Sequence, residues 1–233
     1  MEPVEILYED SQIFVVVKPP GMSSQPERSA SMDMVSCLKN LLSSRDKVKN
    51  PYVSVVHRLD KPVGGVMVYA RTREAAGKLS AQISRRLIDK TYMAVVHGTM
   101  PDREGMVEDI LLRDPKTNTS RVISMEESQA FPDGKRAALS YQVQKTAEVS
   151  GQVYSLVKIK LETGRHHQIR VQMAHLGHPV AGDRRYGNKN DGFFQVGLFS
   201  CGLSFKHPVS GKTMTFTARP QSQPFLIFDK LPL

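Results

Sequence analysis

Apolar residues occur along this chain mainly as short runs separated by turn-forming polar residues, which is typical of strands. The first run, residues 13–17, is rich in β-branched residues and is closed by Lys18-Pro19-Pro20-Gly21. Ser150-Gly151 joins two later runs as an antiparallel pair. The further strands are predicted over residues 91–98, 137–146, 153–161, 198–205 and 213–217.

Three segments have helical spacing instead. Asp33 is expected to cap the first of these helices, and Thr72 is expected to cap the second, which ends at Asp89-Lys90. The third helix is predicted from Arg165 to Leu176 and is stopped by Gly177. The apolar positions of the first two helices are Val35, Leu38, Leu41 and Leu42, then Ala75, Leu79, Ile83 and Leu87.

Strands outnumber helices, and most neighbouring strands are connected by short turns. The pattern therefore predicts an α+β fold with a mixed, mostly antiparallel sheet and flanking helices. A polar, turn-rich loop is expected over residues 23–31, and residues 106–136 show no clear pattern. Because neither an internal repeat nor a linker is evident, residues 1–233 are predicted to form a single domain.

Charge and composition narrow the function classes. Lys and Arg outnumber Asp and Glu by 32 to 23, which gives a net charge of +9. This excess favours a polyanionic partner such as nucleic acid, although a basic surface alone would also produce it. Cys37 and Cys201 lack the CxxC spacing of a zinc or redox site. With an acidic stretch at residues 1–5 and no apolar run of membrane-spanning length, we expect a cytoplasmic protein.

One carboxylate stands out between two apolar runs. Asp60 lies in a polar turn within residues 55–72, next to the cations Arg58 and Lys61. If the chain is extended here, Arg58 and Asp60 share one face, while His57 and Leu59 share the other. Nearby opposite charges favour an ionised carboxylate, which can act as a nucleophile or a base. The alternative is that Asp60 only caps the turn and pairs with Arg58.

Other kinds of site find little support. The chain has no GxxxxGK[ST] phosphate loop, no GxGxxG and no GxSxG nucleophile elbow. Its histidine-rich region lacks the carboxylate or thiol partners, and the HExxH spacing, of a metal site. We therefore expect no metal there. The histidines concerned are His166, His167, His175 and His178.

Five blocks of this sequence, in order, resemble the motifs of RluA-type pseudouridine synthases. His57-Arg58-Leu59-Asp60, followed by the glycine pair Gly64-Gly65, resembles the family's HRLDxxTSG signature. The other four blocks resemble the KPxG loop, the KxY strand, TGRxHQIR and HxGHPxxGDxxYG. They are residues 18–21, 90–92, 163–170 and 175–187. The resemblance implies the family's catalytic fold with a central cleft, without the S4-like domain that many relatives carry.

By this resemblance the protein isomerises uridine in ribosomal or transfer RNA to pseudouridine, needs no cofactor or metal, and works as a monomer. The catalytic residues would be Asp60, Tyr92 and Arg165. Asp60 would be the catalytic carboxylate, and Arg165 would pair with it and keep it ionised. Tyr92 would stack on the flipped uracil and take part in proton movement at C5. Arg58 would fill the vacated base stack. Independently of the resemblance, the conformational freedom of Gly64-Gly65 is expected to permit a sharp reversal after Asp60. The predicted RNA-contacting residues are Arg58, His57, Lys61, Lys90, Gln168, Arg170, Arg184 and Arg185.

The chain departs from the family pattern at Val63-Gly64, where the family has Thr-Ser. The residues also leave three mechanisms open: attack of Asp60 at C1′, addition to the uracil ring, or abstraction of a sugar proton. Two other functions compete. One is a non-catalytic RNA-binding or ribosome-assembly protein, and the other is a metal-dependent nuclease or glycosidase that uses Asp60 with the histidines.

Overall fold

The computed structural model describes residues 4–27 and 31–228, and the chain forms two compact units. The first unit comprises residues up to 90 together with 199–220, and the second comprises 91–198 and the segment from 221. Residues 1–3 of the acidic N-terminus and residues 28–30 of the expected polar loop lie outside the described residues. None of the described helices is long and apolar enough to cross a membrane.

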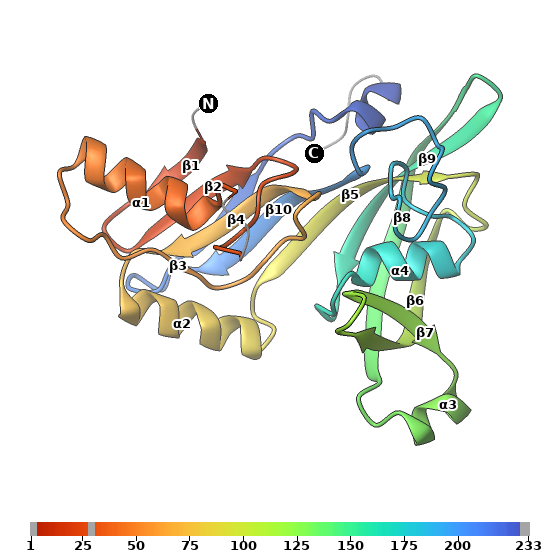
Figure 1. The fold of residues 1–233 in the computed structure, drawn as a ribbon, viewed down its shortest axis with the longest axis horizontal. Helices are drawn as coiled ribbons and strands as arrows, with labels where there is room; N and C mark the ends of the chain where they lie inside the picture. The colour runs from red at the N-terminus through yellow and green to blue at the C-terminus, as the bar shows by residue number, and fades with distance from the viewer. Residues whose placement is uncertain (1–3, 28–30, 229–233) are drawn as a thin grey trace. The chain divides into compact units, whose positions relative to one another are not determined.

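The first unit is built on a mixed sheet (Figure 1). Its strands run in the order β1-β2-β4-β10, with β3 also paired to β4 and β11 to β10. The pairing of β4 with β10 is parallel, and the other pairings are antiparallel. The strands are β1 (Glu5–Glu9), β2 (Ile13–Lys18), β3 (Ser54–Val55), β4 (Gly64–Ala70), β10 (Leu198–Lys206) and β11 (Thr213–Thr217).

Helices α1 (Met34–Arg45) and α2 (Arg73–Ser84) cover opposite faces of this sheet. Alternation along β4 points Val66 and Val68 to the face where Ala75 and Leu79 of α2 pack. Tyr69 points to the other face, where burial, and then the charge of Asp33, the cap of α1, raise the pKa of its hydroxyl. The buried apolar strands therefore form the core between two amphipathic helices.

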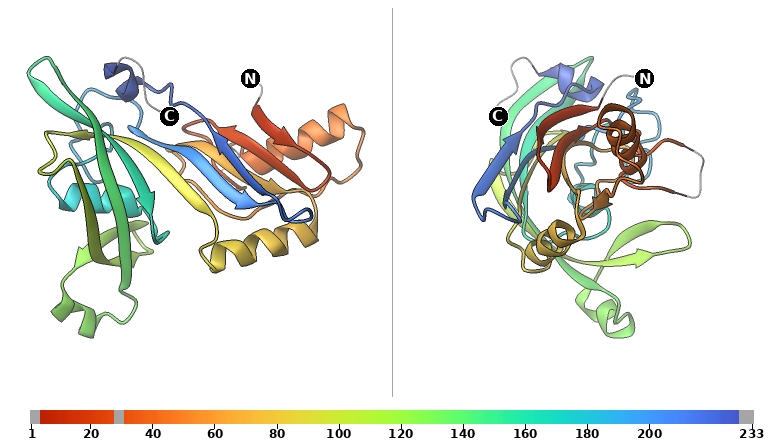
Figure 2. Two further views of the ribbon diagram at one scale, coloured as in Figure 1. Left: turned by 180° about the vertical axis from the view of Figure 1, so that it is seen from behind. Right: turned by 90° about the vertical axis from the view of Figure 1, so that its left-hand side faces the viewer.

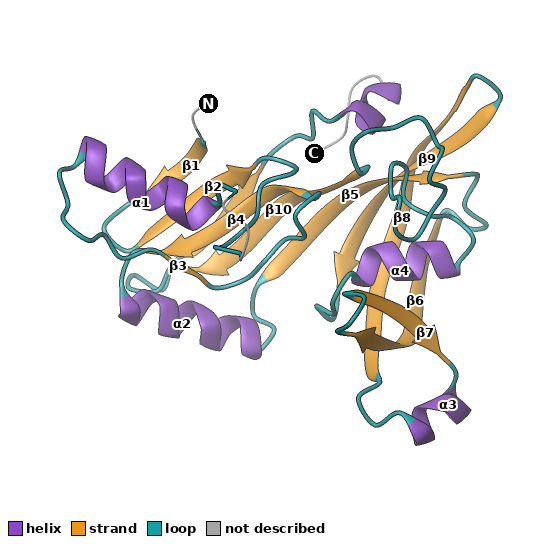
Figure 3. Cartoon of the chain, in the orientation of Figure 1, coloured by secondary structure: helices purple, strands orange, loops and turns teal. Residues whose placement is uncertain are grey.

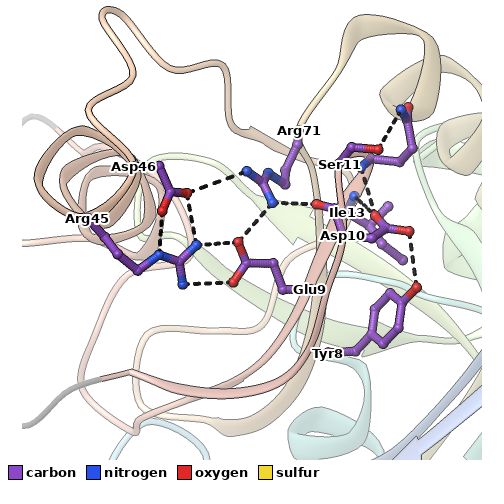
Figure 4. Close-up of polar contacts among 9 residues, drawn as sticks. Tyr8, Glu9, Asp10, Ser11, Ile13, Arg45, Asp46 and Arg71 are labelled. Atoms are coloured by element: carbon purple, nitrogen blue, oxygen red, sulfur yellow. Dashed lines mark hydrogen bonds and ion pairs between the residues drawn. The ribbon is translucent and has the colours of Figure 1, made fainter.

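A network of ion pairs ties together the ends of several elements of the first unit (Figure 4). Arg45, at the end of α1, bonds both carboxylate oxygens of Glu9 and also pairs with Asp46. Arg71, just after β4, donates to Glu9 at 2.9 Å, and its guanidinium lies 4.6 Å from the centre of the Phe14 ring. The network lies at the C-terminal end of β4, whereas Asp60 lies just before the N-terminal end of this strand.

The second unit is an antiparallel sheet with the strand order β5-β9-β8-β6-β7 (Figure 3). Helix α4 packs Val171 against Leu111 and Ala137 on one face of this sheet. Helix α3 follows β7, at the far end of this unit in Figure 2. The elements are β5 (Asp89–His97), β6 (Glu104–Asp114), β7 (Thr119–Ile123), α3 (Met125–Ala130), β8 (Lys135–Val149), β9 (Gln152–Leu161), α4 (Gln168–His175) and a 3-10 helix (Gln223–Ile227).

The predicted α+β class with a mixed, mostly antiparallel sheet is confirmed. Asp33 and Thr72 cap their helices as expected. Asp33 accepts two main-chain N–H groups, and Thr72 accepts one, that of Ala75. Two boundaries were wrong. Helix α2 ends at Ser84, so Leu87 lies beyond it and is 55 % exposed, and Asp89-Lys90 starts β5 rather than ending the helix.

Candidate active site

The predicted strand before Asp60 is only two residues long, and Asp60 lies in the loop between β3 and β4. The expected alternation nevertheless holds in this loop. His57 and Leu59 are buried, Arg58 is exposed, and Asp60 is half-buried. The loop therefore anchors two side chains in the first unit and directs Arg58 and Asp60 to the other side.

The main chain is fixed on both sides of Asp60. On the N-terminal side, the hydroxyl of Ser24 accepts from the Leu59 N–H at 3.2 Å and donates to the Leu59 carbonyl at 2.9 Å. On the C-terminal side, the Gly21 N–H donates to the Lys61 carbonyl at 2.8 Å. The Val63 N–H closes a turn onto the carbonyl of Asp60 itself, at 2.9 Å. The segment after β2 thus holds the loop that carries the carboxylate.

Lys18 strengthens this clamp from inside the protein. Its side chain is fully buried, and its ammonium donates to the carbonyls of Pro19, Met22 and Lys61 at 2.6–3.2 Å. Three acceptors match the three protons of an ammonium group, which offsets part of the cost of burying the charge. Burial still lowers the pKa of Lys18 to about 7, while the charge of Asp60 acts in the opposite direction.

His57 is held beneath the loop as a neutral ring. Its Nε2 accepts from the Val68 N–H of β4 at 3.2 Å, so Nε2 carries no proton and the neutral ring carries it on Nδ1. Burial, and then the charge of Lys90, lowers the pKa of His57 well below its ordinary value. Nδ1 has no hydrogen-bond partner among the described residues. A side chain this buried anchors the loop, so the predicted RNA contact of His57 finds no support.

The glycine pair does not form the reversal predicted after Asp60. The turn lies at Lys61-Pro62, and both glycines belong to β4. Gly65 has a φ of +130°, and a Cβ there would lie 2.3 Å from the carbonyl oxygen of Ser200 in β10. Glycine is needed at this position because two main chains approach closely.

In the second unit, the helix predicted from Arg165 begins three residues later, at Gln168. His167, the residue before α4, has a left-handed φ of +54°. The buried Gln168 side chain accepts from Thr163 and from the Arg165 N–H at 2.8 and 2.9 Å, which folds the preceding segment into a turn. Arg165 therefore lies in that turn, half-buried, and its Nε donates to the Arg136 carbonyl at 2.8 Å.

Arg170 forms a buried ion pair rather than an exposed contact. Its Nε and one terminal nitrogen donate to the two carboxylate oxygens of Asp183 at 2.6 and 2.7 Å. Asp183 also accepts the N–H groups of Arg185 and Tyr186, so it closes the loop in which it lies. Gln168 and Arg170 are both buried, and their polar groups bond other parts of the protein. This is at odds with the RNA contacts predicted for them and favours a structural role.

The histidines of this region also have protein partners. The rings of His166 and His167 stack with their centres 3.7 Å apart. Nδ1 of His166 forms a hydrogen bond with the Ser120 hydroxyl at 2.9 Å, and Nδ1 of His167 forms one with the Tyr186 hydroxyl at 2.7 Å. His175 pairs with Asp109 at 3.1 Å. Among the described residues, no group of three or more His, Cys, Asp or Glu side chains could hold a metal ion.

The remaining predicted residues occupy varied positions. Tyr92 is buried in β5, and Lys90 is half-buried at its start, where burial lowers its pKa to about 8. Lys61, Arg184 and Arg185 are exposed. Asp60 belongs to the first unit and Tyr92 and Arg165 to the second, so the ion pair and the stacking role assigned to them stay predictions.

Sequence reasoning missed two residues of the clamp. The sequence shows Lys18 as part of a loop motif at the end of an apolar strand. A lysine in such a place is itself a signal, because burying it requires several acceptors. Ser24 gave no signal, because serine is common in polar loops. Only the folded chain brings its hydroxyl to Leu59, 35 positions further along.

Comparison with solved structures identifies the fold. The structure titled human RNA pseudouridylate synthase domain containing 1 matches with a TM-score of 0.77 at 24% identity, over 97% of this chain and 89% of that one. The corresponding domain-containing-4 structure matches with a TM-score of 0.74 at 20% identity, over 93% and 89% of the two chains. The chain therefore has the fold of the pseudouridine synthase class.

Sequence comparison gives the family. The RNA pseudouridylate synthase model matches residues 12–175. The chain is 34% identical to the Bacillus subtilis protein called uncharacterized RNA pseudouridine synthase YjbO, over 97% of this chain and 76% of that protein. It is 36% identical to ribosomal large subunit pseudouridine synthase D of Xylella fastidiosa, over 89% of this chain and 63% of that protein.

The chain belongs to the RNA pseudouridylate synthase family. The resemblance stated from five sequence blocks is thereby confirmed, and so is the prediction of an RNA pseudouridine synthase as the enzyme class. The residue roles within the site go beyond what family membership establishes.

Proposed function

We propose that this protein converts uridine in RNA to pseudouridine with Asp60 as the catalytic carboxylate. The observation that carries the proposal is the clamp on both sides of this residue: hydrogen bonds to Leu59 and Lys61 hold the main chain around a half-buried carboxylate. Holding a reacting group in one position is itself a large part of catalysis, because the entropy cost is met before the reaction.

In this reaction the bond between N1 of uracil and C1′ of the ribose breaks, the base rotates, and C5 bonds to C1′. N1 gains the proton that C5 loses, so substrate and product have the same composition. An ionised Asp60 could attack C1′, add to the uracil ring or remove a proton from the sugar, and each route needs an unprotonated carboxylate. Arg58, exposed and two residues away, is suited to stack where the flipped base has left the helix.

Ribosomal RNA is the first substrate to test, because several relatives are named ribosomal large subunit pseudouridine synthases. The proposal includes the finer expectations of a monomer in the cytoplasm, in which both units form one catalytic domain and Arg165 pairs with Asp60. A basic chain of net charge +9 is consistent with RNA as substrate.

Mapping pseudouridine in total RNA from cells with and without this protein would identify the target. A transcript that contains the mapped site should then gain pseudouridine on incubation with the purified protein, and should not do so with Asp60→Asn. If the wild-type protein binds RNA but changes no uridine in either experiment, the alternative of a non-catalytic RNA-binding protein is correct. Full activity of Asp60→Asn would instead refute the role of this carboxylate.

A further inference from the structure

Ser24 is a buried serine whose hydroxyl bonds both main-chain groups of a single residue. Oγ lies 2.9 Å from the Leu59 carbonyl oxygen and 3.2 Å from the Leu59 nitrogen, and the residue is 5 % exposed. A hydroxyl can donate once and accept at the same time, so one side chain satisfies both groups. Leu59 immediately precedes Asp60.

Ser24 is itself fixed to the sheet. The hydroxyl of Tyr69, which is fully buried in β4, donates to the Ser24 carbonyl at 3.0 Å. A continuous series of bonds therefore leads from the central strand through Ser24 to the residue before the carboxylate. The contacts of the Lys61 carbonyl with Gly21 and Lys18 fix the other side of Asp60 and do not involve this series.

We propose that Ser24 is a positioning residue, whose hydroxyl sets the location of the Asp60 carboxylate through the main chain of Leu59. This inference rests on the proposed catalytic role of Asp60. Without the hydroxyl, the N–H and carbonyl of Leu59 would be buried without partners, which is unfavourable enough for the loop to open toward water. Asp60 would move with it, and a shift of about 1 Å in a reacting group can lower a rate roughly a hundredfold.

The experiment compares Ser24→Val with Ser24→Thr. Valine and threonine have nearly the same shape. Both add a methyl group to the Cβ of serine, but threonine keeps the hydroxyl, whereas valine has a second methyl group in its place. Ser23→Ala is the matched control. Ser23 is 2 % exposed, and its hydroxyl has no hydrogen-bond partner among the described residues, so its removal should break no bond. Each variant is assayed for single-turnover pseudouridine formation on the mapped RNA, for RNA affinity and for thermal melting.

We expect Ser24→Val to lower the single-turnover rate about tenfold to a hundredfold. Its RNA Kd should stay within about twofold of wild type, because the hydroxyl faces the protein and not the RNA. Ser24→Thr should stay within about threefold of the wild-type rate, and Ser23→Ala should match it. Assays run well below the lowest melting temperature keep every variant folded, and a rate loss that remains there supports positioning.

A wild-type rate for Ser24→Val would overturn the inference. Equal losses in Val and Thr would also overturn it, because packing and not the hydroxyl would then be responsible. Asp60→Asn distinguishes a failure of the positioning role of Ser24 from a failure of the proposed function. If Asp60→Asn is inactive while Ser24→Val is fully active, the positioning role fails and the proposed function stands. If the wild-type protein forms no pseudouridine, both fail.

Discussion

Asp60 and Asp183 are both held firmly, but by opposite means. Asp183 is fully buried, and its carboxylate is occupied by Arg170 and by main-chain N–H groups of its own loop. Asp60 is half-buried, and the bonds that fix its position are made by the main-chain groups of residues 59–61. The main-chain bonds of residues 59–61 position Asp60 whatever its carboxylate contacts, whereas the bonds to the Asp183 carboxylate use its charge to build the fold.

Replacing Asp60 should therefore affect activity far more than stability. Asp60→Asn keeps the size and polarity of the side chain but removes the charge that the reaction needs. We expect a loss of about a thousandfold or more in single-turnover rate. The loss of stability should be smaller than for Asp183→Asn, although the charge of Asp60 also favours the buried ammonium of Lys18. Quantifying pseudouridine in the target RNA measures the first, and urea denaturation measures the second. If the rate of Asp60→Asn fell only in proportion to the fraction of folded protein, Asp60 and Asp183 would not differ in the way proposed.

Replacing Asp183 should produce the reverse result. Asp183→Asn leaves the guanidinium of Arg170 buried without its counter-charge, and breaking a buried pair in this way costs about 3–5 kcal/mol. This is a large fraction of the roughly 5–15 kcal/mol that stabilises a typical domain. Urea denaturation at pH 7 should show it, and the remaining folded fraction should keep its catalytic rate. A loss below about 1 kcal/mol would mean that the pair behaves like an exposed one.

The glycine pair should separate two kinds of constraint near the Asp60 loop. Gly65→Ala combines an unfavourable φ with overlap against the main chain of Ser200, and we expect about 2–4 kcal/mol of destabilisation. Gly64→Ser restores the residue type of the family signature. Its Cβ would lie 3.1–3.3 Å from Pro20, Lys18 and Phe199, so we expect only about 1–3 kcal/mol. Equal losses, measured by urea denaturation, would show that neither the positive φ nor the closer overlap at Gly65 adds to the destabilisation.

The smallest effect concerns pH and the neutral His57 beneath the loop. Its folded-state pKa lies below the unfolded value, so the unfolded chain binds a proton that the folded protein does not. Its contribution to stability is fully present above about pH 6.5 and falls as the pH decreases, by at most about 1.4 kcal/mol per pH unit. His57→Gln should make the free energy of unfolding less dependent on pH between 7.5 and 5. An unchanged slope would show that the folded and unfolded chains bind a proton at His57 equally, which contradicts a neutral buried ring.

Local pattern was sufficient for much of the fold and for the identity of the candidate carboxylate. Asp33 and Thr72 were recognised as helix caps because a cap depends on neighbours within three residues. Alternation placed His57 and Leu59 on one face, even though the strand expected there is only two residues long. It did not show that this face is the buried one, and His57 was predicted to contact RNA although it is buried. The start of α4 was misplaced because the side-chain bonds of Gln168 form a turn that periodicity does not report.

The sequence by itself determined the class of fold, the family and the position of Asp60 in a loop between apolar runs. Those features depend on short-range spacing and on motifs that are contiguous in the chain. Only the tertiary structure decided which residues hold the carboxylate and which charges build the fold. Ser24 meets Leu59 across 35 positions, Lys18 meets Lys61 across 43, and Arg170 meets Asp183 across a loop. These bonds form because buried polar groups must find partners in the folded protein, wherever the chain brings them.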